Sequence, residues 1–102
     1  MDTDQLIAHG RARFDHAAAR RLLKEKYKAK MLFAYQGGMF QAGPELITLL
    51  HACPVQDDIV ILDLYENPVQ VNPSELQRLA HDRWQEQMNA WLVEHDQLSQ
   101  QR

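Results

Sequence analysis

Two long segments at the ends of this chain carry amino acids that favour α-helix and, beyond their first turns, contain no proline. Residues 4–29 are rich in Ala, Leu, Arg and Lys. Residues 72–98 begin with Asn72-Pro73-Ser74-Glu75, in which Asn is the cap, Pro takes the first helical position and Glu the third. Two helices of this length leave only about 40 residues for the rest of the fold.

The N-terminal segment carries two apolar stripes at helical spacing, and the stripes point in different directions. One stripe holds Ile7, Phe14, Ala18 and Leu22, and the other holds Ala19, Leu23 and Tyr27. We expect one long helix that passes between two surfaces. The alternative is a break near Gly10 or residues 15–17.

The C-terminal segment presents one apolar arc about 120° wide. The arc contains Leu76, Ala80, Trp84, Met88, Trp91, His95 and Leu98. A helix of this length spans about 39 Å, which is more than a sheet of short strands can cover. Its far half must therefore pack on the first helix or on another chain. Because Trp and Met are enriched at the centres of interfaces, the candidate protein interface is Trp84, Met88, Trp91, His95 and Leu98.

A β-hairpin is predicted directly after the first helix. Residues 31–35 alternate with period two, and Gly37-Gly38 supplies the positive φ that a two-residue turn needs. Residues 39–42 form the return strand, so Tyr35 and Phe40 should be cross-strand neighbours.

A short helix and a second hairpin complete the middle of the chain. The helix starts at Gly43-Pro44-Glu45, is expected to be buried because four of its residues are aliphatic, and stops at Cys53-Pro54. Residues 59–65 are rich in β-branched side chains and predict an inner strand, to which residues 69–71 return after Pro68. The predicted fold is α+β in the order α-ββ-α-ββ-α, with the two hairpins forming a small antiparallel sheet.

The length of 102 residues predicts a single domain, residues 1–102. Its parts are a basic N-terminal helix in residues 1–30, a hairpin-helix-hairpin core in 31–71 and an amphipathic C-terminal helix in 72–102.

Charge is distributed unevenly along the chain. Residues 1–30 hold eight of the eleven Lys and Arg against four acids, whereas residues 31–102 hold three against ten. Either the two parts neutralise each other within one molecule, or the basic helix seeks an acidic partner. The basic residues form a stripe on one helix face, with Arg21 at its border: Arg13, Arg20, Lys24 and Lys28. Such a stripe could contact an acidic protein or follow a phosphate backbone.

Sequence motifs of catalysis are absent. There is no phosphate-binding loop, no GxSxG and no HExxH. Cys53 reads as a structural thiol, because His51 cannot reach it from two residues away on a helix. Asp63 on the predicted inner strand could have a raised pKa and act as an acid or base, but the favoured interpretation is a half-buried carboxylate near the hairpin end. The five histidines lack the spacing of a metal site, so we expect no catalytic residues, no metal and no cofactor.

Two features predict the compartment. The single cysteine cannot form an internal disulfide, and the acidic start Met1-Asp2-Thr3-Asp4 does not resemble a secretory signal. Apolar runs such as residues 59–62 are far too short to cross a membrane. An intracellular location, in the cytoplasm or in a virion, is therefore expected.

These observations favour a small non-enzymatic protein that associates with itself or with a larger complex through its long terminal helices. The interpretation is an adaptor or structural accessory protein, comparable in size and style to small accessory and virion proteins of bacteria and tailed phages. The alternative is a nucleic-acid-binding accessory protein that uses the basic stripe of the first helix.

Overall fold

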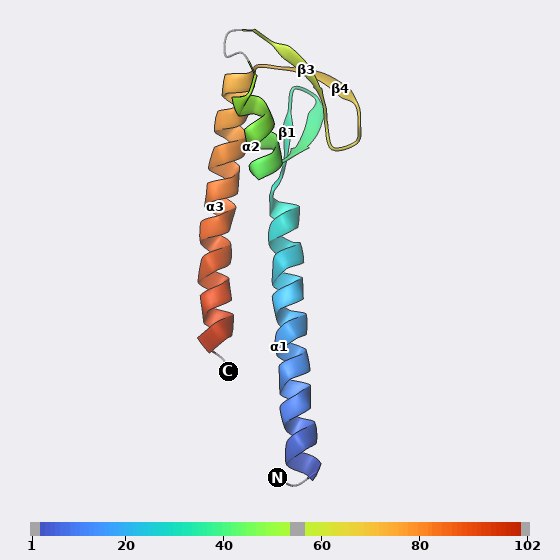
Figure 1. Ribbon diagram of the computed structural model, residues 1–102, viewed down its shortest axis with the longest axis vertical. Helices are drawn as coiled ribbons and strands as arrows, with labels where there is room; N and C mark the ends of the chain where they lie inside the picture. Colours follow the sequence, from blue (N-terminus) through green and yellow to red (C-terminus); the bar gives the residue numbers. More distant parts are fainter. Residues whose placement is uncertain (1–2, 54–56, 101–102) are drawn as a thin grey trace.

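A computed structural model describes residues 3–53 and 57–100, apart from the side chains of residues 4–14. Its elements are α1 (Thr3–Lys30), β1 (Leu32–Tyr35), β2 (Gly38–Gln41), α2 (Pro44–His51), β3 (Ile59–Leu62), β4 (Pro68–Val71) and α3 (Pro73–Gln100). The order α-ββ-α-ββ-α confirms the predicted α+β arrangement (Figure 1). The predicted stop of the short helix at Pro54 lies outside the described residues.

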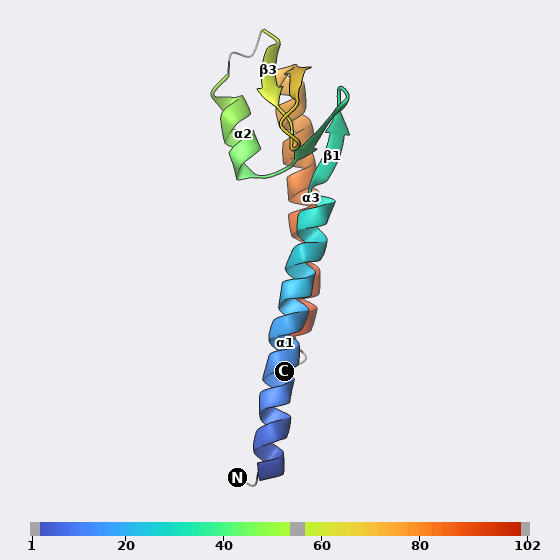
Figure 2. The same ribbon diagram turned by 90° about the vertical axis from the view of Figure 1, so that its right-hand side faces the viewer.

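The two long helices run antiparallel, side by side, and carry the hairpins and α2 at one end (Figures 1 and 2). The molecule measures 68 × 24 × 20 Å and has a radius of gyration of 19.4 Å. A compact domain of about 100 residues has a radius of gyration of about 13 Å. The chain is therefore a long helix pair with a small packed head.

The first hairpin forms as predicted, but its turn lies one residue earlier. Gln36 and Gly37 take positive φ values of 50° and 80° and make the turn, so Gly38 becomes the first residue of β2. Phe40 consequently lies opposite Phe33, and Tyr35 contacts the Phe40 ring diagonally, with centroids 6.4 Å apart. The two rings are cross-strand neighbours as predicted, in a diagonal rather than a directly opposed position.

The shifted register of this hairpin has a steric cause. A Cβ atom at Gly38 would lie 2.7 Å from Val69 Cγ2 and 3.3 Å from Asp63 Cβ. Gly38 is therefore needed inside the strand, where the second hairpin approaches β2, and the turn uses Gln36 instead.

The two hairpins form two separate two-stranded sheets rather than one continuous sheet. The strand β3 is accordingly not an inner strand, as had been expected, and it ends at Leu62 rather than at Tyr65. Its side chains alternate: Ile59 and Ile61 pack against the core, while Val60 and Leu62 are 66% and 63% exposed. Pro68 stands at the start of β4, where its missing N–H costs no ladder bond.

The hydrophobic core lies in the head, where both hairpins and α2 cover the first half of α3. Its buried residues are Met31, Phe33, Tyr35, Phe40, Ala42, Leu50, Val69, Val71, Leu76 and Ala80. The expectation that α2 is buried was only partly right: Leu50 is buried, but Leu49 is 49% exposed. The helix α3 begins as predicted, because the Glu75 N–H donates to Asn72 Oδ1 over 3.0 Å.

The close approach at Gly38 predicts a large effect of one added methyl group. Gly38→Ala should destabilise the fold by about 1–3 kcal/mol, because Val69 must shift to admit the new Cβ. Gly43→Ala is the control, since a Cβ there meets nothing within 4 Å, and should change stability by less than about 0.5 kcal/mol. Urea unfolding measures both variants, and equal stabilities would contradict the packing described here.

Candidate functional site

The buried carboxylate of Asp63 lies between the two hairpins. Its Oδ2 accepts a hydrogen bond from the Met39 N–H over 3.1 Å. Its Oδ1 accepts from the N–H groups of Tyr65 and Asn67 over 3.0 and 2.9 Å. Since the side chain is only 9% exposed, these three backbone donors replace the water that the carboxylate loses on folding.

These hydrogen bonds, led by the one from Asn67, lower the pKa of Asp63 below its ordinary value. Sequence reasoning had considered a raised pKa, and the shift is in the opposite direction; it had favoured a half-buried carboxylate, whereas Asp63 is buried. The carboxylate fastens the turn of the second hairpin to β2.

Other side chains that could carry reactive chemistry either hydrogen-bond to the backbone or lie apart from one another. The Cys53 thiol is half-buried and donates to the Leu49 carbonyl over 3.2 Å. Across residues 3–53 and 57–100, no three His, Cys, Asp or Glu side chains cluster as metal ligands would.

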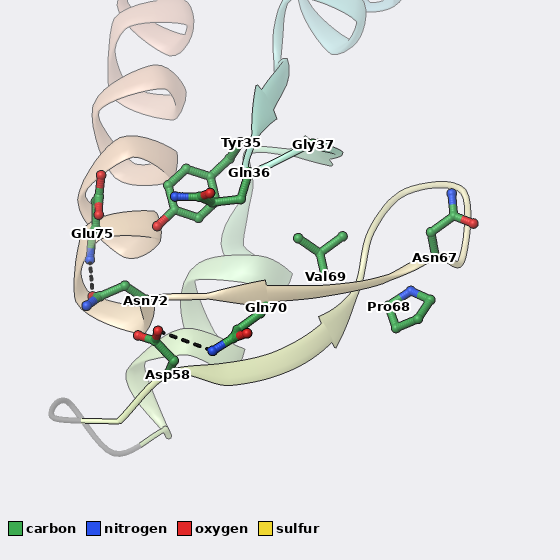
Figure 3. A pocket seen from close by; sticks show the side chains of 10 residues that line it. All are labelled: Tyr35, Gln36, Gly37, Asp58, Asn67, Pro68, Val69, Gln70, Asn72 and Glu75. Atoms are coloured by element: carbon green, nitrogen blue, oxygen red, sulfur yellow. Dashed lines mark hydrogen bonds between the residues drawn. The ribbon is translucent and has the colours of Figure 1, made fainter.

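A depression of about 760 Å³ in the head is polar and open (Figure 3). It lies between the first hairpin turn, β4 and the start of α3. Its two acids serve local structure: Asp58 accepts from Gln70 Nε2 over 3.4 Å, and Glu75 belongs to the cap of α3. We assign it no chemistry.

The two long helices are joined by an aromatic stack and an ion pair. The rings of Tyr27 and Trp91 lie 5.9 Å apart and nearly parallel, at 6°. Lys26 Nζ contacts both oxygens of Glu94, at 2.8 and 3.1 Å. The ammonium groups of Lys26 and Lys30 each lie 5.3 Å from the centre of the Tyr27 ring, within reach of a cation–π attraction.

The pKa shifts of Lys26 and Glu94 agree with their ion pair. The hydrogen bond from Lys26 lowers the pKa of Glu94, and the hydrogen bond to Glu94 raises the pKa of Lys26. Sequence analysis named neither residue. Lys26 borders the stripe of Ala19, Leu23 and Tyr27. The only sequence signal for the ion pair would have been to take this stripe as the face of α1 that packs on α3.

The predicted interface residues on α3 are mainly used inside the chain. Trp84 and Met88 pack against the core, Trp91 stacks on Tyr27, and Leu98 lines a shallow cleft with Ala19 and Leu23. His95 is exposed. The long helices therefore satisfy much of their apolar surface by pairing with each other.

The first apolar stripe of α1 faces elsewhere. Leu22 belongs to it and is 64% exposed, while the side chains of Ile7 and Phe14 lie outside the described set. The helix is continuous, which confirms the prediction of one long helix, and the alternative break near Gly10 or residues 15–17 does not occur. On α3, Leu92 and Val93 are 59% and 57% exposed, and sequence reasoning had not named either.

The basic stripe is exposed where the structure describes it. Arg20, Arg21, Lys24 and Lys28 all have exposed side chains, and the Arg13 side chain lies outside the described residues. Within the described part of the chain, none of these four joins the ion pair that links α1 to α3.

A groove of about 480 Å³ opens beside the first turn of α2, between α1 and α3. Met88 and Trp91 form its floor on α3, Lys28 stands on its α1 side, and Leu62 and Leu64 border its upper end. A second, shallower depression of about 200 Å³ continues it along α3, lined by Met88, Trp91, Leu92 and His95. Because the two share Met88 and Trp91, they form one surface, which we call the helix groove.

Comparison with protein-family models, curated proteins and solved structures finds no match to this chain. In the part of the chain that is described, no helix has an apolar stretch long enough to cross a bilayer.

The lowered pKa of Asp63 gives stability a defined pH dependence. The carboxylate should stabilise the fold above about pH 4, the ordinary pKa of an aspartate, and this stabilisation should be lost as the pH falls further. Asp63→Asn puts an NH2 group against the Met39 N–H, so it should be less stable at pH 7, with a difference that shrinks below pH 4. Urea unfolding from pH 7 to pH 3 measures this, with Glu66→Gln in the same exposed turn as control. A constant difference would contradict the assignment.

The stack of Tyr27 on Trp91 predicts that neighbouring residues of α3 differ in their effect on folding. Trp91→Ala should lower stability by about 2 kcal/mol, because it removes the half-buried ring between the helices. Leu92→Ala should change it by less than about 0.5 kcal/mol. Thermal unfolding by circular dichroism compares them, and equal losses would mean that the stack does not hold the helices together.

Proposed function

We propose that this chain is a non-enzymatic association module, an adaptor or structural accessory protein that binds another protein through the surface of its helix pair. The observation that carries this proposal is the set of large apolar side chains left exposed on the two long helices: Leu22, Leu92 and Val93. Isolated exposed apolar residues are ordinary on a protein surface. Here they lie on an elongated helix pair, and Leu92 lines the helix groove.

The overhang of α1 supports the same proposal. With Tyr27 opposite Trp91 and Leu98 beside Ala19, α3 ends well before the start of α1 (Figures 1 and 2). The N-terminal turns of α1 extend past that end, so the long axis of the molecule carries helix surface that α3 does not cover.

The free thiol of Cys53 fits a reducing compartment, so we place this association inside the cell or in a virion assembled there. The size of the chain suits the accessory or virion proteins of bacteria and tailed phages.

Nucleic-acid binding is the second candidate function. One observation favours it: Arg20, Arg21, Lys24 and Lys28 are all exposed. It requires affinity that weakens steeply as salt rises.

The native mass of the chain in its own cells tests the association. In fresh extract the chain should elute in an assembly larger than its 11.9 kDa, at low and at high salt. The double substitution Leu22→Asp with Leu92→Asp should release the free chain, because it places charges on the exposed apolar positions. Asn89→Asp, on an exposed position of α3, is the control and should leave the assembly intact. A wild-type chain that elutes alone would refute the proposed function.

A further inference from the structure

The helix groove has two chemically different walls. The α3 wall is apolar, with Met88 and Trp91 half-buried and Leu92 exposed beside them. The α1 wall is basic, because Lys28 lines the groove and Lys24 and Arg20 follow on the same helix face, one turn and two turns further down. A partner that fits both walls must be amphipathic and must carry negative charge along one side.

The spacing of the basic residues specifies how the partner's negative charges must be arranged. Arg20, Lys24 and Lys28 repeat every four residues, so their side chains rise along α1 in steps of about 6 Å. Another α-helix with acids at every fourth position repeats in the same steps. An extended strand with acids at every second position repeats at about 6.6 Å, but it places its apolar side chains on the opposite face, whereas a helix carries acids and aliphatic side chains on adjacent stripes. The wall covers about 12 Å, which about two to three turns of a helix can follow.

The antiparallel pairing of α1 and α3 places the two walls level with each other. Tyr27 faces Trp91 and Lys26 faces Glu94, so Lys28 is near the level of Trp91 and Lys24 near that of His95. The basic wall and the apolar wall therefore face each other across the groove at the same height. At the upper end Glu45 also borders the groove, so a partner's acids belong at the lower end, beside Lys24 and Lys28.

We infer that the helix groove binds an acidic amphipathic helix of a different protein, with carboxylates four residues apart beside a ridge of aliphatic side chains. This inference rests on the proposed function and names its partner. Charge complementarity with the exposed stripe selects the acids, and Met88, Trp91 and Leu92 receive the ridge.

A second copy of this chain fits the groove less well. The four-residue acidic spacing occurs on its own α3 at Asp82 and Glu86, but Glu94 on that helix is already paired with Lys26. The exposed residues within one turn of Glu86 include Gln85, Asn89 and Ala90, which do not make a ridge of large aliphatic side chains. A nucleic acid would use the basic wall but would leave the apolar wall uncovered.

A designed peptide tests the inference with the intact protein. The probe is a labelled peptide of about 18 residues, long enough for several helical turns, with glutamates four apart on one stripe and leucines on the adjacent stripe. Two matched peptides carry glutamine or lysine in place of the glutamates. Fluorescence anisotropy should show micromolar binding of the glutamate peptide, at least about tenfold weaker binding of the glutamine peptide, and none of the lysine peptide.

Substitutions locate the binding site. Lys28→Glu and Leu92→Asp should each weaken binding of the glutamate peptide by about tenfold or more. Arg78→Glu and Val60→Asp are the controls, because both side chains are exposed and neither lines the groove; they should bind like the wild type. Circular dichroism checks that all four variants keep the fold.

Four outcomes would overturn the inference. They are equal binding of the glutamine and glutamate peptides, no binding up to millimolar concentration, a homodimer in light scattering that Leu92→Asp breaks, and displacement of the peptide by a duplex oligonucleotide that binds more tightly. If peptide binding fails while the native assembly still depends on Leu22 and Leu92, the partner class is wrong and the association module stands.

Discussion

The hydrogen bonds to Asp63 hold the head of this protein together. The two hairpins share no ladder, and a two-stranded hairpin alone is marginally stable in water. One carboxylate joins them by accepting the Met39 N–H from β2 and two N–H groups from its own turn, while the Leu64 N–H donates to the Met39 carbonyl over 2.7 Å. The absence of a side chain at Gly38 permits this approach. Without the hydrogen bonds to Asp63, the two hairpins over the first half of α3 would separate.

The head in turn connects the two long helices. The chain leaves α1 directly into β1, and β4 leads within two residues into α3, so the docked hairpins join the end of α1 to the start of α3, which lies further along the long axis of the molecule (Figure 1). From there the helices run antiparallel, and the Tyr27–Trp91 stack fixes their relative height. Beyond this stack the hydrophobic core does not continue between the helices. This explains both the elongated shape and the exposed side chains of Leu22 and Leu92.

Local patterns predicted the elements well, and long-range contacts account for what they missed. The Asn72 cap, the hairpin turns and both long helices follow from short-range rules. The turn at Gln36-Gly37 could not be predicted, because the demand for glycine at position 38 comes from Val69, thirty-one residues away. The burial of Asp63 is similar, since its donor Met39 belongs to another hairpin. For the candidate site, the apolar arc of the last helix includes Trp91 and the basic stripe of the first includes Lys28. Only the pairing of the helices shows that these two residues border one groove.

The same pairing changes the role of the aromatic residues on α3. Trp91 is half-buried against Tyr27, so it offers a partner only one edge, at the floor of the groove. Its larger contribution is to set the height of α1 against α3. A slip of one helical turn would move the walls about 6 Å past each other, and Lys28 would face a different level of the apolar wall. Selectivity for an acidic helix would then depend on an intrachain stack as much as on the side chains that touch the partner.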